Sequence, residues 1–342
     1  MDTRIDPGKH PYCARPWRQV TFLSDGTAVC ACIDAARTNP LGNIHERTFD
    51  EIWNGPEYRQ LRGLIASDQI DAVPICQQCP NRISDGPADR SKVEGFPYPT
   101  SLYLESVAAC NLKCPGCDRE AIEGNRDGKL VMDMDAYKKI IDPLSPNLTY
   151  MEYHLGGENF MHKQWPEMIR YAKDNNPNVF VLTSTNGHYF RNTEEREALV
   201  NCGIDGVIFS IDGATQESYE KYRVRGKLDL VLDAMKGVIE ARERLGKTRP
   251  LICWRYILFE WNDSEEEMNL ARQMAKDIGV DFFAWHLNVA EADYSSARYH
   301  IGSPHLEEIA DELWDNIQYS VQLPAVYDPY SDTTIQHTSV EA

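Results

Sequence analysis

The stretch Ala109-Cys110-Asn111-Leu112-Lys113-Cys114-Pro115-Gly116-Cys117 directly follows an apolar run at residues 101–107 and places three cysteines in the spacing C-x3-C-x2-C. Three thiolates this close can wrap one side of a metal cluster, whereas a [4Fe–4S] cube contains four irons. One iron would then lack a protein ligand and could bind a substrate or cofactor, as the open position of a catalytic zinc site does. The alternative is a structural zinc site completed by His154 or His188, although this spacing is unusual for zinc.

Short apolar runs alternate with amphipathic stretches from residue 101 onward. The runs lie at residues 101–107, 150–155, 179–184, 206–211, 252–259 and 281–288, and helix-like spacing falls at residues 135–141, 166–173, 193–201, 228–245 and 264–278. Six such β/α repeats predict a parallel sheet with helical crossovers, either a partial TIM-like barrel or an open doubly wound sheet. In both folds the chemistry lies at the carboxyl ends of the strands, where the cysteine loop is expected.

Composition and charge narrow the class of protein. The 342 residues carry 35 Lys and Arg against 53 Asp and Glu, a net charge of −18, which disfavours nucleic acid and anionic membranes as partners. No apolar run approaches the ~20 residues of a membrane span, and the N-terminus lacks the apolar segment of a secretory signal. We therefore expect a cytoplasmic protein, in which eight of the ten cysteines, clustered in two groups, favour metal binding over disulfides.

A Pro- and Gly-rich stretch at residues 85–99 predicts a domain boundary near residue 96. We expect a cysteine-rich domain at residues 1–95, the β/α domain at residues 96–290, and a C-terminal helix with a polar tail at residues 291–342. The N-terminal cysteines are Cys13, Cys30, Cys32, Cys76 and Cys79. Four thiolates complete the ligand set of a [4Fe–4S] cluster but equally suit a zinc ribbon, which the spacing alone slightly favours.

Over about residues 100–290 the chain resembles the radical SAM superfamily, which implies a partial (β/α)6 barrel. The resemblance makes Cys110, Cys114 and Cys117 the ligands of a [4Fe–4S] cluster whose open iron chelates S-adenosylmethionine (SAM). It also implies reductive cleavage of SAM to a 5′-deoxyadenosyl radical. The implied SAM-binding residues are Gly156, Gly157, Glu158, Asn186, Ser210, Asp212 and Arg223. Taken alone, these residues could equally form a tight turn, a helix cap and solvated surface charges.

Two residues depart from the usual pattern of this superfamily. Asn159 replaces the proline of the Gly-Gly-Glu-Pro motif. Gly116 replaces an aromatic residue that often touches adenine, so that an adenine shelf must come from elsewhere in the chain.

The N-terminal region resembles the SPASM auxiliary-cluster domain. Four of its features recur in that domain: the hairpin turn Asp25-Gly26, Leu-Gly-Asn-Ile at residues 41–44, Glu-Ile-Trp-Asn at residues 51–54, and the final C-x2-C. The resemblance implies a second, auxiliary [4Fe–4S] cluster held by Cys13, Cys32, Cys76 and Cys79, with Cys30 as the alternative to Cys32. This domain normally follows the barrel, whereas here it precedes it.

The resemblance leaves the substrate open. We expect hydrogen abstraction from a small polar molecule such as a sugar or amino sugar, with net oxidation (dehydrogenation) or epimerisation assisted by the auxiliary cluster and a one-electron donor of the flavodoxin or ferredoxin type. The alternative is a peptide or protein maturase acting on a ribosomal peptide. Strand alternation puts Cys253 on one face with Arg255, where its thiol could return a hydrogen atom, although a buried strand cysteine more often serves as a small hydrophobe.

Overall fold

The computed structural model describes residues 13–30, 34–77, 79, 97–117, 119–288 and 294–313. Its strands form one sheet in the order β3-β2-β1-β4-β5-β6-β7-β8-β9. They are β1 (Gln19–Phe22), β2 (Thr27–Val29), β3 (Gly42–Asn43), β4 (Ser101–Leu104), β5 (Tyr150–Glu152), β6 (Phe180–Thr185), β7 (Gly206–Ser210), β8 (Leu251–Leu258) and β9 (Phe282–Leu287). Strands β4 to β9 are parallel, which confirms the predicted partial barrel.

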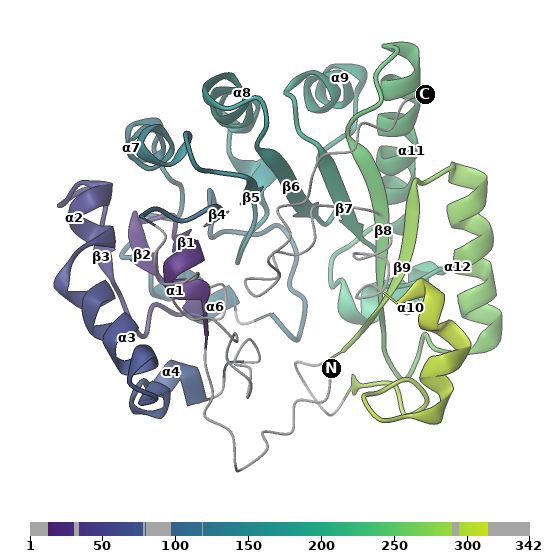
Figure 1. Ribbon diagram of the computed structural model, residues 1–342. Helices are drawn as coiled ribbons and strands as arrows, with labels where there is room; N and C mark the ends of the chain where they lie inside the picture. The colour runs from purple at the N-terminus through teal and green to yellow at the C-terminus, as the bar shows by residue number, and fades with distance from the viewer. Residues whose placement is uncertain are drawn as a thin grey trace.

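Helices connect the parallel strands as crossovers. They are α6 (Arg119–Gly124), α7 (Met134–Leu144), α8 (Trp165–Asn175), α9 (Thr193–Asn201), α10 (Gln216–Tyr222), α11 (Leu228–Arg244) and α12 (Glu265–Ile278). Figure 1 shows the strands in an arc, with α7, α8, α9, α11 and α12 along its outer side. In the described part of the chain, no helix is both long and apolar enough to cross a membrane.

The ends of the chain differ in part from the prediction. Near the C-terminus the structure has a 3-10 helix, η5 (Pro304–Glu312), where the sequence predicts an α-helix, and the rest of that predicted helix lies outside the described residues. The N-terminal region contributes α1 (Arg15–Arg18), α2 (Phe49–Trp53), α3 (Pro56–Ala66) and α4 (Pro74–Gln77).

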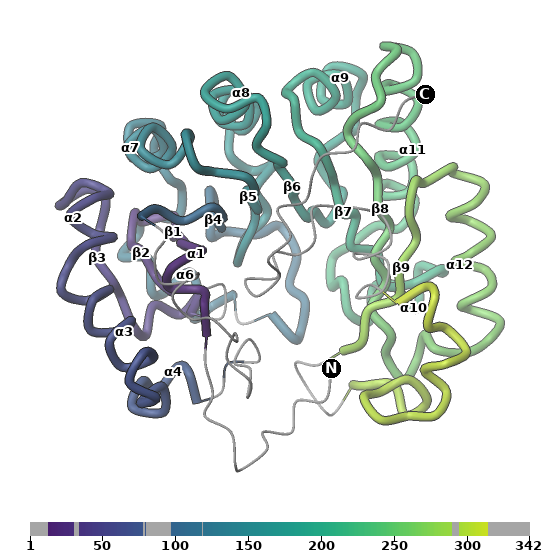
Figure 2. Tube along the Cα trace, in the orientation of Figure 1, coloured from purple at the N-terminus to yellow at the C-terminus, as the bar shows by residue number. Residues whose placement is uncertain are grey.

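The N-terminal region extends the sheet of the barrel. Strand β1 pairs in parallel with β4, with Thr21 aligned to Tyr103, and β2 and β3 continue the sheet in antiparallel pairing. Its core is also continuous with that of the barrel, since Phe22 and Trp53 belong to the same buried cluster as Leu102. The predicted boundary near residue 96 lies outside the described residues, and the sheet spans both sides of it. Figure 2 follows this continuous path in the orientation of Figure 1.

The sheet has two differently filled faces. On β8, Trp254 and Tyr256 are fully buried in the core between sheet and helices, whereas Cys253 belongs to a separate cluster on the inner face of the arc. That inner cluster consists of Tyr150, Phe180, Leu182, Ile208, Cys253 and Ala284. We call the inner side of the arc the lumen, and the apolar cluster forms its floor.

A buried ion pair joins the N-terminal hairpin to the barrel. Arg126 Nε lies 2.6 Å from Glu105 Oε1, and both side chains have no exposed surface. Glu105 Oε1 also accepts from the backbone N–H of Ser24 at 3.1 Å, and Arg126 Nη2 donates to the carbonyl of Ala35 at 2.7 Å. Because Glu105 and Arg126 lie on either side of the cysteine loop, this pair ties both ends of the loop to each other and to the hairpin.

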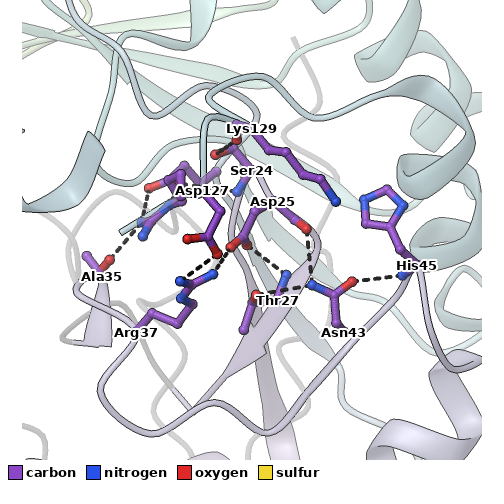
Figure 3. A network of polar contacts seen from close by, with 11 residues as sticks. Ser24, Asp25, Thr27, Ala35, Arg37, Asn43, His45, Asp127 and Lys129 are labelled. Carbon is purple, nitrogen blue, oxygen red and sulfur yellow. Dashed lines mark hydrogen bonds and ion pairs between the residues drawn. The ribbon is translucent and has the colours of Figure 1, made fainter. Parts of the chain in front are cut away.

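More exposed contacts surround this pair (Figure 3). Arg37 bridges Asp25 at 2.5 Å and Asp127 at 2.9 Å, while Ser24 Oγ donates to the carbonyl of Lys129 at 2.9 Å. Cavities of about 440 Å³ and 550 Å³ flank Lys129, and no cysteine is among their lining residues. Charged side chains from the N-terminal region and from the barrel therefore hold the two parts together.

Replacing Arg126 by methionine is expected to lower the free energy of unfolding by about 3–5 kcal/mol, because the carboxylate of Glu105 would stay buried without its partner. Urea unfolding under anaerobic conditions measures this loss. The control is Arg244→Met, which breaks an exposed pair with Glu197 and should cost less than about 1 kcal/mol. Equal losses in the two variants would contradict the structural role of the buried pair.

Candidate active site

The cysteine loop lies between the carboxyl end of β4 and α6. Cys110 and Cys114 are half-buried and Cys117 is exposed. Burial raises the pKa of the Cys110 thiol to about 11, and the negative charges of Glu158, Cys114 and Cys117 add to the effect. The three thiols are therefore close enough to repel one another as thiolates, which suits a cationic group bound among them.

A glycine pair brings the end of β5 against the cysteine loop. A Cβ on Gly157 would lie 2.1 Å from the carbonyl oxygen of Val107 and 2.7 Å from that of Ala109, so that only glycine fits there. The backbone N–H of Glu158 then donates to the carbonyl of Ala109 at 2.9 Å. Gly157 thus has a steric reason to be glycine that a simple turn would not require.

The carboxylate of Glu158 holds the end of β6. It accepts from Thr185 Oγ1 and from the backbone N–H of Asn186, each at 2.8 Å. Burial raises the pKa of Glu158 to about 7, while these hydrogen bonds oppose the shift. The amide of Asn186 in turn donates to Asn111 Oδ1 at 2.8 Å and lies 3.6 Å from Cys110 Sγ.

The guanidinium of Arg223 lies on the other side of the cysteine loop, where Asp212 holds it. Arg223 Nε lies 2.5 Å from Asp212 Oδ2, and Arg223 Nη1 lies 3.8 Å from Cys114 Sγ. Asp212 is fully buried, and its Oδ1 accepts from the backbone N–H of Ile257 at 2.8 Å. Arg225, the other arginine of this segment, is exposed. The structure thus brings Gly157, Glu158, Asn186, Asp212 and Arg223 to the cysteine loop.

Both departures from the usual pattern have structural counterparts. Asn159 is fully buried, where its amide links Ser106 at 3.3 Å to Thr183 at 3.5 Å. A Cβ on Gly116 would lie 3.1 Å from the hydroxyl of Tyr222 and 3.4 Å from its ring. An aromatic side chain from α10 therefore occupies the space beside Gly116.

Tyr222 belongs to an aromatic group that the sequence analysis did not identify. Its ring centroid lies 4.4 Å from that of Phe259, which stacks on Trp261 at 4.9 Å. The indole N–H of Trp261 is buried without a hydrogen-bond partner among the described residues. The only sequence signal for this group was the missing aromatic residue at Gly116.

The two histidines considered as zinc ligands have other contacts. Nε2 of His188 accepts from the backbone N–H of Lys227 at 3.0 Å, and Nδ1 lies 2.9 Å from Asn186 Oδ1. His154 lies in the lumen, with Nε2 3.8 Å from Glu152 Oε2. Within the described residues, no three Cys, His, Asp or Glu side chains converge on a single-ion site.

A second group of thiols lies in the N-terminal region. Cys13 and Cys76 are buried, and Cys30 and Cys79 are half-buried. Burial raises the pKa of Cys30 well above its usual value, and the thiols of Cys13, Cys76 and Cys79 raise it further. Cys30 is therefore close to the other three, whereas Cys32 lies outside the described residues.

Two predicted residues lie deeper than the cysteine loop. Ser210 Oγ is 3.0 Å from Ser184 Oγ and accepts from Arg255 at 3.0 Å. Cys253 is 4% exposed and part of the apolar floor of the lumen, where burial raises its pKa to about 12.

Two known families match the parts of the chain that contain the two groups of cysteines. Residues 104–285 match the family described as the radical SAM superfamily, and residues 13–80 match SPASM, described as an iron–sulfur cluster-binding domain. The first match covers more than half of the chain, so the protein belongs to the radical SAM superfamily and is an enzyme. It carries its SPASM domain N-terminal to the radical SAM domain. These domains imply a [4Fe–4S] cluster, SAM and auxiliary iron–sulfur binding.

The chain is also similar to individual proteins. It is 29% identical over 185 residues to the tungsten-containing aldehyde ferredoxin oxidoreductase cofactor-modifying protein of Pyrococcus furiosus, a match covering 53% of this chain and 49% of that protein. It is 28% identical over 127 residues to the PqqA peptide cyclase of Bradyrhizobium diazoefficiens, covering 37% and 32%. The chain thus matches half or less of the length of these relatives.

Among solved structures, the fold is similar to the crystal structure of Streptococcus suis SuiB. The TM-score is 0.51 at 13% identity, and the match covers 79% of this chain and 61% of SuiB. At this identity the similarity concerns the fold alone.

The pKa of His188 is lowered to about 4, first of all by burial, so its protonation opposes folding. Its contribution to stability is complete above the unfolded pKa of about 6.5 and is lost as the pH falls toward the folded value. We expect His188→Gln to remove about 1.5–2 kcal/mol of the stability difference between pH 7 and pH 5. Urea unfolding at both pH values measures this, with the exposed His300→Gln as control. If the free energy of unfolding of His188→Gln changed with pH as it does in the wild type, the lowered pKa of His188 would be contradicted.

Proposed function

We propose that Cys110, Cys114 and Cys117 hold the SAM-binding cluster and that the enzyme abstracts hydrogen from a peptide or protein substrate. The observation that carries the first part is the convergence of Glu158, Asn186 and the Arg223–Asp212 pair on the cysteine loop. When bound and reduced, the cluster supplies the electron that cleaves SAM to methionine and the 5′-deoxyadenosyl radical.

The remaining residues of the site bind and orient SAM. The Arg223 guanidinium, held by Asp212, offers a positive charge to the methionine carboxylate beside Cys114. The backbone carbonyls of Gly156 and Gly157 offer acceptors to the ammonium group, while the Glu158 carboxylate, bonded to Thr185 and Asn186, keeps the end of β6 in place. Tyr222, backed by Phe259, offers adenine an aromatic face in the place left open by Gly116.

The peptide alternative has more support than the small polar metabolite first expected. One relative is named a PqqA peptide cyclase. The sheet is also open: in the part of the chain that is described, its edge strands β3 and β9 lie at opposite ends of the strand order. An open sheet suits a substrate longer than the lumen itself.

The auxiliary thiols belong to the N-terminal region, whose strand β1 pairs with β4 of the barrel. Arg15 Nη1 donates to Gln19 Oε1 at 2.5 Å, and the charge of Arg15 also acts on the Cys30 thiol. Gln19 aligns with Ser101 on β4, which aligns with Tyr150 of the lumen floor. An auxiliary cluster on the same sheet as the cysteine loop supports net oxidation, with Cys13, Cys30, Cys76 and Cys79 as auxiliary ligands.

The apolar surroundings of Cys253 support its role as a core residue rather than as the hydrogen donor of an epimerase. Superfamily members need an electron donor, here of the flavodoxin or ferredoxin type.

Replacing Cys114 by alanine is expected to abolish SAM cleavage, because two thiolates would remain of the three that hold the cluster. The measurement is 5′-deoxyadenosine formed after anaerobic reconstitution and dithionite reduction. Cys202→Ala, a buried core position, serves as the control. Retained SAM cleavage in Cys114→Ala would contradict the proposed role of Cys114 as a cluster ligand.

Replacing Cys76 and Cys79 together should remove about four irons per chain, the content of one cluster, while leaving some SAM cleavage. Iron and sulfide analysis of the reconstituted protein measures this, again against Cys202→Ala. We expect the single variant Cys30→Ala to lose the same iron and Cys32→Ala to keep it. Wild-type iron in the double variant would rule out the auxiliary site, and loss in Cys32→Ala alone would reassign the fourth ligand.

A further inference from the structure

Two buried hydrogen-bond donors in the N-terminal region lack an acceptor. The hydroxyl of Tyr58 and Nη2 of Arg62 are buried and have no hydrogen-bond partner among the described residues. Both residues lie on α3, about one helical turn apart, and Tyr58 has no exposed surface. Buried polar groups in folded proteins are almost always paired, so two orphaned donors on one face of a helix indicate an acceptor beside that face.

The guanidinium of Arg62 is held in place by its other contacts. Its Nε donates to the carbonyl of Pro16 at 2.9 Å, and its Nη1 donates to the carbonyl of Trp53 at 2.8 Å. Its Cζ lies 4.1 Å from the ring centroid of Trp53 and 4.8 Å from that of Tyr58. Because these contacts fix the group, Nη2 is held away from water and keeps one direction.

The helix that carries both donors packs beside the auxiliary cysteines. It contacts α1, which begins two residues after Cys13. It also contacts the 3-10 helix η2 (Ile70–Ala72), which packs against α4, the helix that contains Cys76. Cys30 packs against the buried cluster to which Tyr58 belongs. Three of the four auxiliary thiols are therefore on segments that surround α3.

The charges of these groups also act on one another. Burial raises the pKa of Tyr58, and the negative charge of Cys30 raises it further. Burial lowers the pKa of Arg62, while the charges of Tyr58 and Cys30 oppose that shift. Both donors are thus within electrostatic reach of the Cys30 thiolate, and thiolate and sulfide sulfurs are the acceptors that an iron–sulfur cluster offers.

We propose that Tyr58 and Arg62 donate hydrogen bonds to sulfur atoms of the auxiliary cluster and thereby raise its reduction potential. Reduction adds one negative charge to a cluster that already has four thiolate ligands. Donors and a cation beside the sulfurs therefore stabilise the reduced form more than the oxidised form. This inference rests on the proposed function, because it takes the auxiliary ligands as assigned there. Neither residue is a ligand; both set how readily the cluster accepts an electron.

The test is a potentiometric titration of the reconstituted full-length chain, followed by EPR spectroscopy. The signal that does not change when SAM is added belongs to the auxiliary cluster, and the SAM-sensitive signal is an internal control. In Tyr58→Phe and in Arg62→Gln we expect the reduction equilibrium of the auxiliary cluster to fall about tenfold, which is about 59 mV for a one-electron couple. Arg62→Lys should give a smaller shift, because it keeps the charge but not the planar set of donors.

Electron–nuclear double resonance distinguishes a direct hydrogen bond from a structural effect. The reduced auxiliary cluster of the wild type should show couplings to protons that exchange in D2O, and Tyr58→Phe should lose one of them. The matched controls are Tyr137→Phe, which removes a buried hydroxyl of the barrel, and Arg59→Gln, which removes an exposed arginine of α3. Neither control should change the potential or the couplings.

An auxiliary potential that is unchanged in Tyr58→Phe or in Arg62→Gln would overturn the proposal, as would an equal shift in the controls. Retention of every exchangeable coupling in Tyr58→Phe would overturn it as well. A wild-type chain that takes up only about four irons would instead refute the auxiliary cluster of the proposed function.

Discussion

The buried carboxylate of Glu105 joins the N-terminal region to the barrel. It lies fully buried at the end of β4, paired with Arg126, and it accepts from the backbone of the N-terminal hairpin. A buried charge of this kind is tolerated only while its partners stay in place. The pair therefore fixes the ends of the cysteine loop relative to each other and holds the N-terminal region on the barrel. Strand β1, paired with β4, makes the same connection through the backbone.

The active site is built upon this frame by close backbone packing and fixed charges. Gly157 lets β5 approach the cysteine loop, so that Glu158 can hold the end of β6 beside Cys110. Arg223 meets the opposite side of the loop because Asp212 holds it there. The lumen below changes from polar to apolar within a few residues along each strand, with Arg255 in the polar layer and Cys253 in the floor. The inner side of the barrel thus has charged groups beside the cysteine loop and an apolar layer deeper along the strands.

Much of this was predictable from the sequence, because strand and helix periodicity and the C-x3-C-x2-C spacing are local signals. The parallel sheet, the cysteine loop and Gly156-Gly157-Glu158 all follow from such patterns. Contacts between distant segments were not predictable: residue types do not reveal that β1 pairs with β4, that Glu105 meets Arg126, or that Tyr222 fills the space beside Gly116. The choice between Cys30 and Cys32 depends on the path of the chain, since spacing alone fits both. Cys30 lies close to Cys13, Cys76 and Cys79, and Cys32 lies outside the described residues.

We infer that one continuous sheet carries two cluster sites and that SAM is cleaved at one of them. The decisive measurement is anaerobic reconstitution of the wild-type chain, with iron and sulfide counted and 5′-deoxyadenosine assayed on the same sample. We expect about eight irons per chain, two cubes of four, together with deoxyadenosine that requires both SAM and reductant. About four irons with deoxyadenosine would contradict the second cluster, and a fully loaded protein that forms no deoxyadenosine would contradict the radical activity.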